Sequence, residues 1–172
     1  MIGAGRLTRP DWKQYQILGE ELLNQPDSAS QSRWIAETIS RRIDGRASVW
    51  LAARYYPLPG EPKIETIPNP AAPHLVQTTL ETMTITRHSH ARGDDGACDS
   101  SNGAAEIAFP LLAQDNLLGV VHVKRADGPP FSPDEVEYLE GLILYAALTM
   151  QFSRQEKIKN WRQEQLALVR SV

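Results

Sequence analysis

The chain has 172 residues, 41% of them hydrophobic, and a net charge of −3 at pH 7. This length suits one domain that buries a core without disulfides or metals, and the weakly acidic charge offers no field that attracts nucleic acid or an anionic membrane. A single cysteine, Cys98, excludes an intramolecular disulfide framework and is typical of proteins from a reducing compartment.

The sequence also carries no membrane or export signal. The longest uninterrupted apolar run, residues 142–148, is too short to cross a bilayer, and the N-terminal residues lack the apolar core of a signal peptide. We therefore expect a cytoplasmic protein with no membrane segment and no nucleic-acid partner. The chain could equally be one part of a larger protein.

Two helices are expected before the first strand. We expect residues 1–9 to form a flexible lead and residues 10–25 to form an N-terminal flanking helix, which has a narrow apolar stripe of the kind found in helix-pairing seams. The stripe consists of Trp12, Tyr15, Leu18 and Leu22. Ser28 and Gln31 are predicted to open the second helix as a capping box. One face of that helix should lie against a sheet, and it carries Ile35, Ile39 and Ile43.

Short elements follow. Residues 46–53 alternate in the manner of a strand, and prolines then force a loop before a short second strand at residues 63–67. Residues 74–83 are expected to form a helix and residues 84–87 a third strand.

The clearest pattern lies in residues 105–152. Residues 105–112 are apolar on both faces, as in a strand covered on both sides, and turn-forming residues at 114–116 lead into a second strand over residues 117–124. A capping box with proline at the first helical position then predicts a helix from residue 133 to about residue 172. The residues of this helix start are Ser132, Pro133 and Glu135.

This stretch resembles the C-terminal half of a GAF domain. The resemblance rests on three motifs in the family's order and spacing, which are Phe109-Pro110-Leu111, Leu118-Gly119-Val120 and Phe131-Ser132-Pro133-Asp134-Glu135-Val136. It implies an α+β fold: a central antiparallel sheet of five to six strands, helices on both faces, and long N- and C-terminal flanking helices. The GAF-like domain would cover residues 28–152, and residues 153–172 would form a C-terminal signalling or coiled-coil extension.

The resemblance also implies a small-molecule cavity between the sheet and residues 84–103. Residues 88–103 lack hydrophobic periodicity, which fits either a functional loop or a disordered surface insertion. The candidate ligand contacts are Trp50, His88, His90, Phe109 and His122. Trp50 and His122 are expected on central strands, where amphipathic side chains can contact a ligand in an apolar pocket. The alternative is that Trp50 is packing and His122 is a satisfied core histidine, and Phe109 fits the core better than a ligand contact.

The residues do not identify a cofactor. The side chains of His88, His90, Cys98 and His122 can ligate metals, but their spacing matches no established zinc or haem motif, so no metal is expected. Bilin-binding GAF domains normally have an aromatic residue or histidine after the cysteine, where this chain has Asp99. Free methionine sulfoxide reductases of the GAF family use several cysteines, and a single one cannot complete that cycle internally.

Cyclic-nucleotide-binding GAF domains pair a lysine of an N-K motif with an aspartate of an F-D-E motif. Only the charge signs survive here, at Arg125 and Glu135, so the two residues form either a salt bridge or a solvated surface pair. Cyclic nucleotides are therefore one candidate ligand among several.

The end of the chain suggests helix pairing. A second narrow seam consists of Ile158, Trp161, Gln165, Leu168 and Val172, and with the N-terminal stripe it predicts a homodimer through the flanking helices. The resemblance implies a noncatalytic sensor or regulatory domain, with an output domain following in a longer protein. The alternatives are a ligand-free dimerisation module and, without support from any catalytic motif, a small redox enzyme or metal-binding protein.

Overall fold

The computed structural model describes residues 10–89 and 104–172. In chain order the elements are α1 (Trp12–Leu23), α2 (Ser28–Arg42), β1 (Arg46–Ala52), β2 (Thr66–Ile67), α3 (His74–Thr82), β3 (Thr86–Ser89), β4 (Ala105–Ala113), β5 (Asn116–Arg125) and α4 (Pro133–Arg170). The strands form one five-stranded sheet in the order β2-β1-β5-β4-β3. The α+β fold expected from the sequence is confirmed.

The sheet is antiparallel except at one edge. β1 pairs with β5, β5 with β4, and β4 with β3 in antiparallel register, whereas β2 adds to β1 in parallel through two residues. β2 is also shorter than the strand expected over residues 63–67. Pro62 and Pro68 flank this segment, and a proline has no backbone N–H for a strand ladder.

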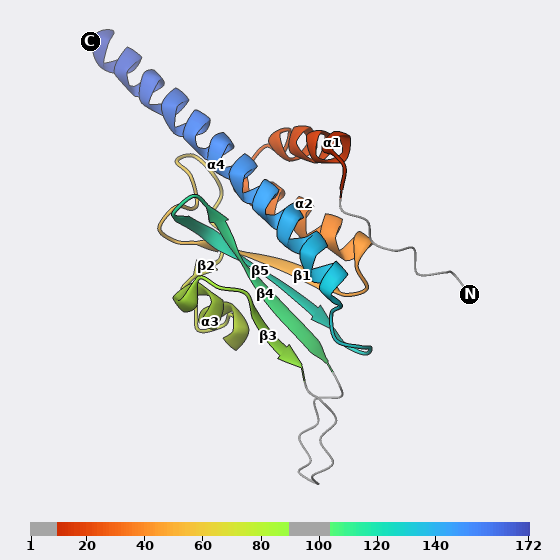
Figure 1. Cartoon of the computed structure of the whole chain (residues 1–172). Coiled ribbons are helices and arrows are strands. Elements are labelled where there is room, and N and C mark those ends of the chain that lie inside the picture. The colour runs from red at the N-terminus through yellow and green to blue at the C-terminus, as the bar shows by residue number, and fades with distance from the viewer. Residues whose placement is uncertain (1–9, 90–103) are drawn as a thin grey trace.

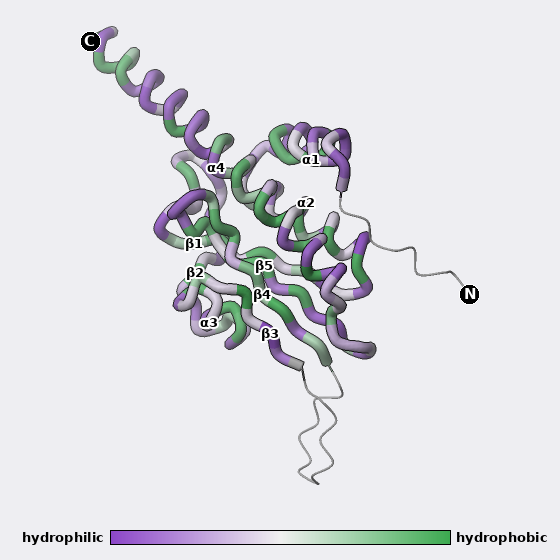
Figure 2. The backbone as a smooth tube through the Cα atoms, in the orientation of Figure 1, coloured by the Kyte–Doolittle hydropathy of each residue, from purple (hydrophilic) through white to green (hydrophobic). Residues whose placement is uncertain are grey.

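Helices cover both faces of the sheet, as expected. α1, α2 and α4 lie on one face and α3 lies on the other (Figure 1). Figure 2 shows hydrophobic residues along β4, β5 and the part of α4 that crosses the sheet, where the main core lies. A smaller core lies under α3 and consists of Ile67, Ala72, Val76, Ala108 and Val120.

The start of α2 differs from the prediction by one residue. Asp27, not Ser28, is the N-cap, because its carboxylate accepts a hydrogen bond from the Ser30 amide at 2.7 Å. Ser28 and Gln31 are both buried, and their side chains bond to residues distant in sequence. The capping box predicted at Ser132 and Glu135 is confirmed, with Pro133 at the start of α4.

The stripe on α1 packs within the chain. Leu22 is 1% exposed, and the rings of Tyr15 and Tyr145 lie with their centroids 5.2 Å apart between α1 and α4. Of the four stripe residues, Trp12 is exposed and Leu18 is partly buried against the core. α4 of the same chain therefore covers most of this stripe, and the pairing of the stripe with a second copy stays a prediction.

α4 is one continuous helix of 38 residues, which corresponds to a length of about 57 Å. Its first part packs on β4 and the core, and every residue from Lys159 onward is exposed. The helix therefore projects beyond the domain (Figure 1).

Candidate functional site

The sheet register arranges the side chains beneath α3 in rows. The first row is Arg46, Lys124, Glu106 and His88, and the second is Ser48, His122, Ala108 and Thr86. The third row is Trp50, Val120 and Pro110. α3 packs on the apolar residues of the second and third rows. The charged first row and the β1–β5 part of the second row form what we call the polar half of the α3 face.

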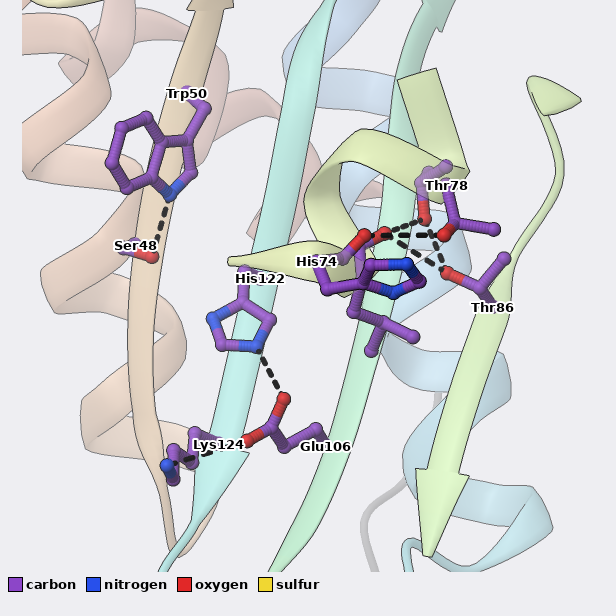
Figure 3. Close-up of polar contacts among 10 residues, drawn as sticks. Ser48, Trp50, His74, Thr78, Thr86, Glu106, His122 and Lys124 are labelled. Carbon is purple, nitrogen blue, oxygen red and sulfur yellow. Dashed lines mark hydrogen bonds and ion pairs between the residues drawn. The ribbon is translucent and has the colours of Figure 1, made fainter. Parts of the chain in front are cut away.

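Glu106 lies at the centre of the polar half. Its Oε2 is 3.2 Å from Nε2 of His122, and its Oε1 is 3.3 Å from Nζ of Lys124 (Figure 3). Burial would raise the pKa of Glu106, but the hydrogen bonds and charges of these two neighbours lower it below its usual value. With the carboxylate ionised, Nε2 of His122 donates the bond, so in the neutral ring Nδ1 is an acceptor.

Trp50 fixes the side chain of Ser48. The indole is half-buried against the small core, and its Nε1 donates a hydrogen bond to Oγ of Ser48 at 3.2 Å (Figure 3). Because Ser48 Oγ already accepts this bond, its own proton is available for a further acceptor.

α3 is held over the sheet by threonines. Thr79 bonds to Thr86 on β3, and both hydroxyls also bond to the carbonyl of Leu75 within α3, at 2.9 Å from Thr79 and 3.4 Å from Thr86. Thr79 is fully buried, so these bonds fix the position of α3 relative to β3.

The polar half opens into a hollow of about 760 Å³. Arg46, Ser48, His122 and Lys124 come from the strands and form its floor, whereas Asp44 and Asp127 lie in the flanking loops and form its rim. This hollow is the candidate ligand site.

The predicted site residues are only partly brought together. Trp50, His88 and His122 share the α3 face, and His122 is 7% exposed whereas His88 is exposed. Phe109 lies on the opposite face in the main core and is 1% exposed, because strand alternation turns it away from Ala108. Phe109 therefore does not line this hollow, and its role as a ligand contact stays a prediction. His90 lies outside the described residues.

Four site residues were missed by sequence reasoning. Arg46, Ser48, Glu106 and Lys124 join His122 on one face through strand register. The hairpin turn gave a usable signal for two of them, since the β4–β5 register places Glu106 opposite Lys124 and diagonal to His122. Arg46 and Ser48 required the β1–β5 pairing, which the sequence does not specify.

An ion pair joins the end of the site strand to α4. Arg125 is 5% exposed, and its Nη2 lies 2.7 Å from Oε1 of Glu135. Its Nε and Nη1 donate to the carbonyls of Asp44 and Pro129, both at 2.8 Å, and its guanidinium stacks on Phe131. The salt bridge that the charge signs allow is confirmed, and the alternative of a solvated surface pair is wrong.

The described residues contain no group of three or more His, Cys, Asp or Glu side chains arranged to hold a metal ion. Within those same residues, no helix combines the length and hydropathy needed to cross a bilayer.

No protein-family model and no curated protein matches the chain. Several solved structures, however, are similar to the chain. A proposed GAF sensor protein from Burkholderia vietnamiensis is 19% identical, with a TM-score of 0.58 over 91% of this chain and 97% of that one. The GAF domain of a phosphoenolpyruvate-protein phosphotransferase from Coxiella burnetii is 12% identical, with a TM-score of 0.56 over 84% of this chain and 94% of that one.

An enzyme is also among the similar structures. The free methionine-R-sulfoxide reductase from Neisseria meningitidis, in complex with its substrate, is 17% identical, with a TM-score of 0.56 over 87% of this chain and 96% of that one. The expectation of a noncatalytic protein is therefore wrong as an inference from this fold, because an enzyme shares it. Similarity at these identities establishes the architecture alone. The architecture that the chain shares with these structures shows that it has a GAF-like fold.

Proposed function

We propose that this chain is a sensory or regulatory domain of a signalling protein, which binds a small molecule in the hollow on the α3 face and transmits the binding event through α4. The observation that carries the proposal is the incomplete cover of that face. α3 covers its apolar part, and the buried His122 and its polar neighbours line a hollow large enough for a small ligand.

A short path leads from the hollow to α4. Lys124 lies on the floor of the hollow, and the next residue, Arg125, also lines the hollow and bonds through its guanidinium to Glu135 in the first turn of α4. The backbone carbonyl of Asp44, two residues before Arg46, accepts a hydrogen bond from the same guanidinium. A ligand that displaces β1 or β5 at the hollow would therefore change the bonds that hold the start of α4, provided that it binds one arrangement more tightly than the other.

The output of such a change would be the pairing of two copies. We propose a homodimer in which the exposed end of α4 lies against its counterpart, as the seam at residues 158–172 predicts. The dimer would pass a change in the angle or register of α4 to a following output domain.

A thermal-shift screen of metabolites and cyclic nucleotides tests the ligand proposal. A ligand present at about 100 times its dissociation constant should stabilise the fold by about 2.7 kcal/mol. His122→Gln should reduce the shift, whereas Arg87→Gln should not, because Arg87 pairs opposite Ile107 and lies on the other face of the sheet. A ligand whose effect survives His122→Gln unchanged would place the binding elsewhere and contradict the proposal.

The similarity to a reductase makes a parallel activity assay necessary. Purified protein should be incubated with free methionine sulfoxide and a dithiol reductant, with Cys98→Ser as the matched variant. Turnover that depends on Cys98 would replace the sensor proposal with a catalytic one.

A further inference from the structure

We infer that the hollow on the α3 face selects small molecules carrying a carboxylate or phosphate group, held on its floor by Arg46, Ser48 and Lys124. This inference rests on the proposed ligand-binding function and names the chemical class of the ligand. The hydrogen-bonding groups that remain free on the floor determine this class.

The acceptors nearest the floor already hold one partner each. In Glu106, which lies beside the hollow, one carboxylate oxygen bonds to His122 and the other to Lys124. The Ser48 oxygen accepts the Trp50 indole proton. A ligand that offers only donors would therefore share these oxygens with existing bonds and use their remaining lone pairs.

Donors, by contrast, are in excess. Within residues 10–89 and 104–172 no hydrogen bond or ion pair engages the Arg46 guanidinium, and its register partner on β5 is Lys124, also a cation. Lys124 has protons beyond the one directed at Glu106, and Ser48 has its hydroxyl proton. Two cations opposite one another on a strand pair repel, and an anion placed between them relieves that repulsion.

The charges around the hollow limit the ligand further. The cations Arg46 and Lys124 on the floor outweigh Glu106, which lies beside the hollow and bonds to Lys124, whereas the rim carries the carboxylates of Asp44 and Asp127. His122 and His88 are the other titratable groups on this face, and Arg125 is engaged by Glu135. A single oxyanion on the floor is favoured, whereas a ligand with several charges would be repelled at the rim.

The test uses model probes and a local reporter. Benzoate and phenyl phosphate are the anionic probes, and benzamide is the uncharged counterpart of benzoate. Each is titrated into ¹⁵N-labelled protein while the Trp50 indole N–H resonance is followed; that resonance is assigned by its loss in Trp50→Phe. Benzoate, phenyl phosphate or both should shift the signal saturably, and benzamide should bind at least about tenfold more weakly, the usual worth of a charged hydrogen bond.

Matched variants locate the anion. Arg46→Gln should weaken binding of the active probe about tenfold, whereas Arg87→Gln removes the same charge from the opposite face and should leave binding unchanged. Asp127→Asn should strengthen binding, because it removes a repulsive charge from the rim. If Arg46→Gln and Arg87→Gln weaken binding of the probe equally, the attraction is non-specific and the inference is overturned.

The remaining outcomes separate this inference from the proposed function. If benzamide shifts the Trp50 signal as strongly as benzoate, the anionic class is wrong and the binding site stands. If neither the probes nor the metabolite panel shifts any resonance of the hollow, both proposals fail.

Discussion

At the scale of single residues, the contact of α1 with α4 depends on two glycines. A Cβ atom on Gly141 would lie 2.6 Å from the hydroxyl of Tyr15, and a Cβ on Gly19 would lie 2.6 Å from the hydroxyl of Tyr145. Each helix thus supplies a tyrosine whose oxygen occupies the space above a glycine of the other. These contacts bring the two helices together more closely than larger residues would allow.

Gly141→Ala should therefore destabilise the protein by about 1 kcal/mol, because the cost of overpacking exceeds the gain in helix propensity. Tyr15→Phe removes the clashing oxygen and leaves the ring carbon Cζ at 3.9 Å as the nearest atom of that side chain. In that background Gly141→Ala should be neutral or stabilising by up to about 1 kcal/mol. Urea unfolding of the wild type, the two single variants and the double variant measures the coupling free energy between Gly141→Ala and Tyr15→Phe.

The Gly19 contact provides the control. With Tyr145→Phe, ring carbons at 3.1 and 3.2 Å from the new Cβ remain, so the rescue of Gly19→Ala should be incomplete. An equal cost of Gly141→Ala in both backgrounds would contradict the role given to the Tyr15 hydroxyl.

The ion pair at the start of α4 predicts a pH dependence. Burial would raise the pKa of Glu135, but the Ser132 amide and Arg125 lower it below the usual value of 4.5. Because the carboxylate is favoured in the folded state, its contribution to stability is present above the unfolded pKa and is lost as pH falls through the lowered folded pKa. The free energy of unfolding should therefore decrease as the pH falls below about 4.5.

Glu135→Gln should make that decrease shallower. Glu106→Gln should act in the same direction, since the pKa of Glu106 is also lowered. Glu164→Gln, at an exposed position on the projecting part of α4, is the matched control. Chemical unfolding between pH 3 and pH 7 tests this, and an unchanged slope in Glu135→Gln would contradict it.

At the scale of elements, the exit of α4 from the domain is held by Glu61. Its carboxylate accepts hydrogen bonds from the Ser28 amide at 3.1 Å, the Ser28 hydroxyl at 2.7 Å and the Leu58 amide at 3.1 Å, and Nζ of Lys157 lies 3.5 Å away. One side chain thus joins the loop after β1, the N-terminus of α2 and the last packed turns of α4. A carboxylate is favoured at a helix N-terminus, where backbone N–H groups lack partners.

Glu61→Ala should cost about 2–3 kcal/mol, because it leaves the donors of Ser28 and Leu58 without an acceptor in a partly buried place. Lys157→Met should cost less than about 1 kcal/mol, because the Lys157 side chain is 36% exposed and its ion pair is screened. Thermal and urea unfolding compare the two. Similar costs would mean that the ion pair, and not the bonds to α2 and the loop, stabilises the junction.

The Glu61 junction illustrates which parts of the fold could be predicted from the sequence: those whose partners are neighbours in the chain. The α4 capping box and the β4–β5 hairpin depend on neighbouring residues, and both were predicted. Ser28 and Gln31 also fit a capping box, but their partners are Glu61 and Ser153, which lie 33 and 122 residues away. Local pattern does not contain those partners, so Asp27 was overlooked as the true cap.

The candidate site, too, has some features that the sequence reveals and others that depend on contacts between distant elements. Trp50 and His122 were predicted because each is an unusual residue in a central strand, and both lie on the α3 face, whereas strand alternation directs Phe109 to the opposite face. The hollow itself arises because α3 covers only the apolar part of its face. That position depends on the Thr79–Thr86 contact between two elements, which periodicity within either one does not reveal.

At the scale of the whole molecule, α4 divides into a packed part and a projecting part. Met150 is fully buried, whereas the residues from Lys159 onward are all exposed. The stability of the domain should therefore depend little on the projecting part, and its exposed apolar side chains are available for another helix. They include Leu166, Leu168 and Val169, at 58, 62 and 74% exposure.

The proposed dimer makes a sharp distinction between two of these leucines. Leu168 belongs to the seam of alternating three- and four-residue steps and Leu166 does not, although their exposures are nearly the same. Leu168→Glu should therefore shift the protein towards monomer in sedimentation equilibrium, whereas Leu166→Glu should leave the association constant nearly unchanged. Both variants should keep the wild-type unfolding free energy of the domain within about 0.5 kcal/mol, because neither residue is buried in the monomer. Equal effects on association would contradict the seam, and a wild-type chain that stays monomeric at all concentrations would contradict pairing through α4.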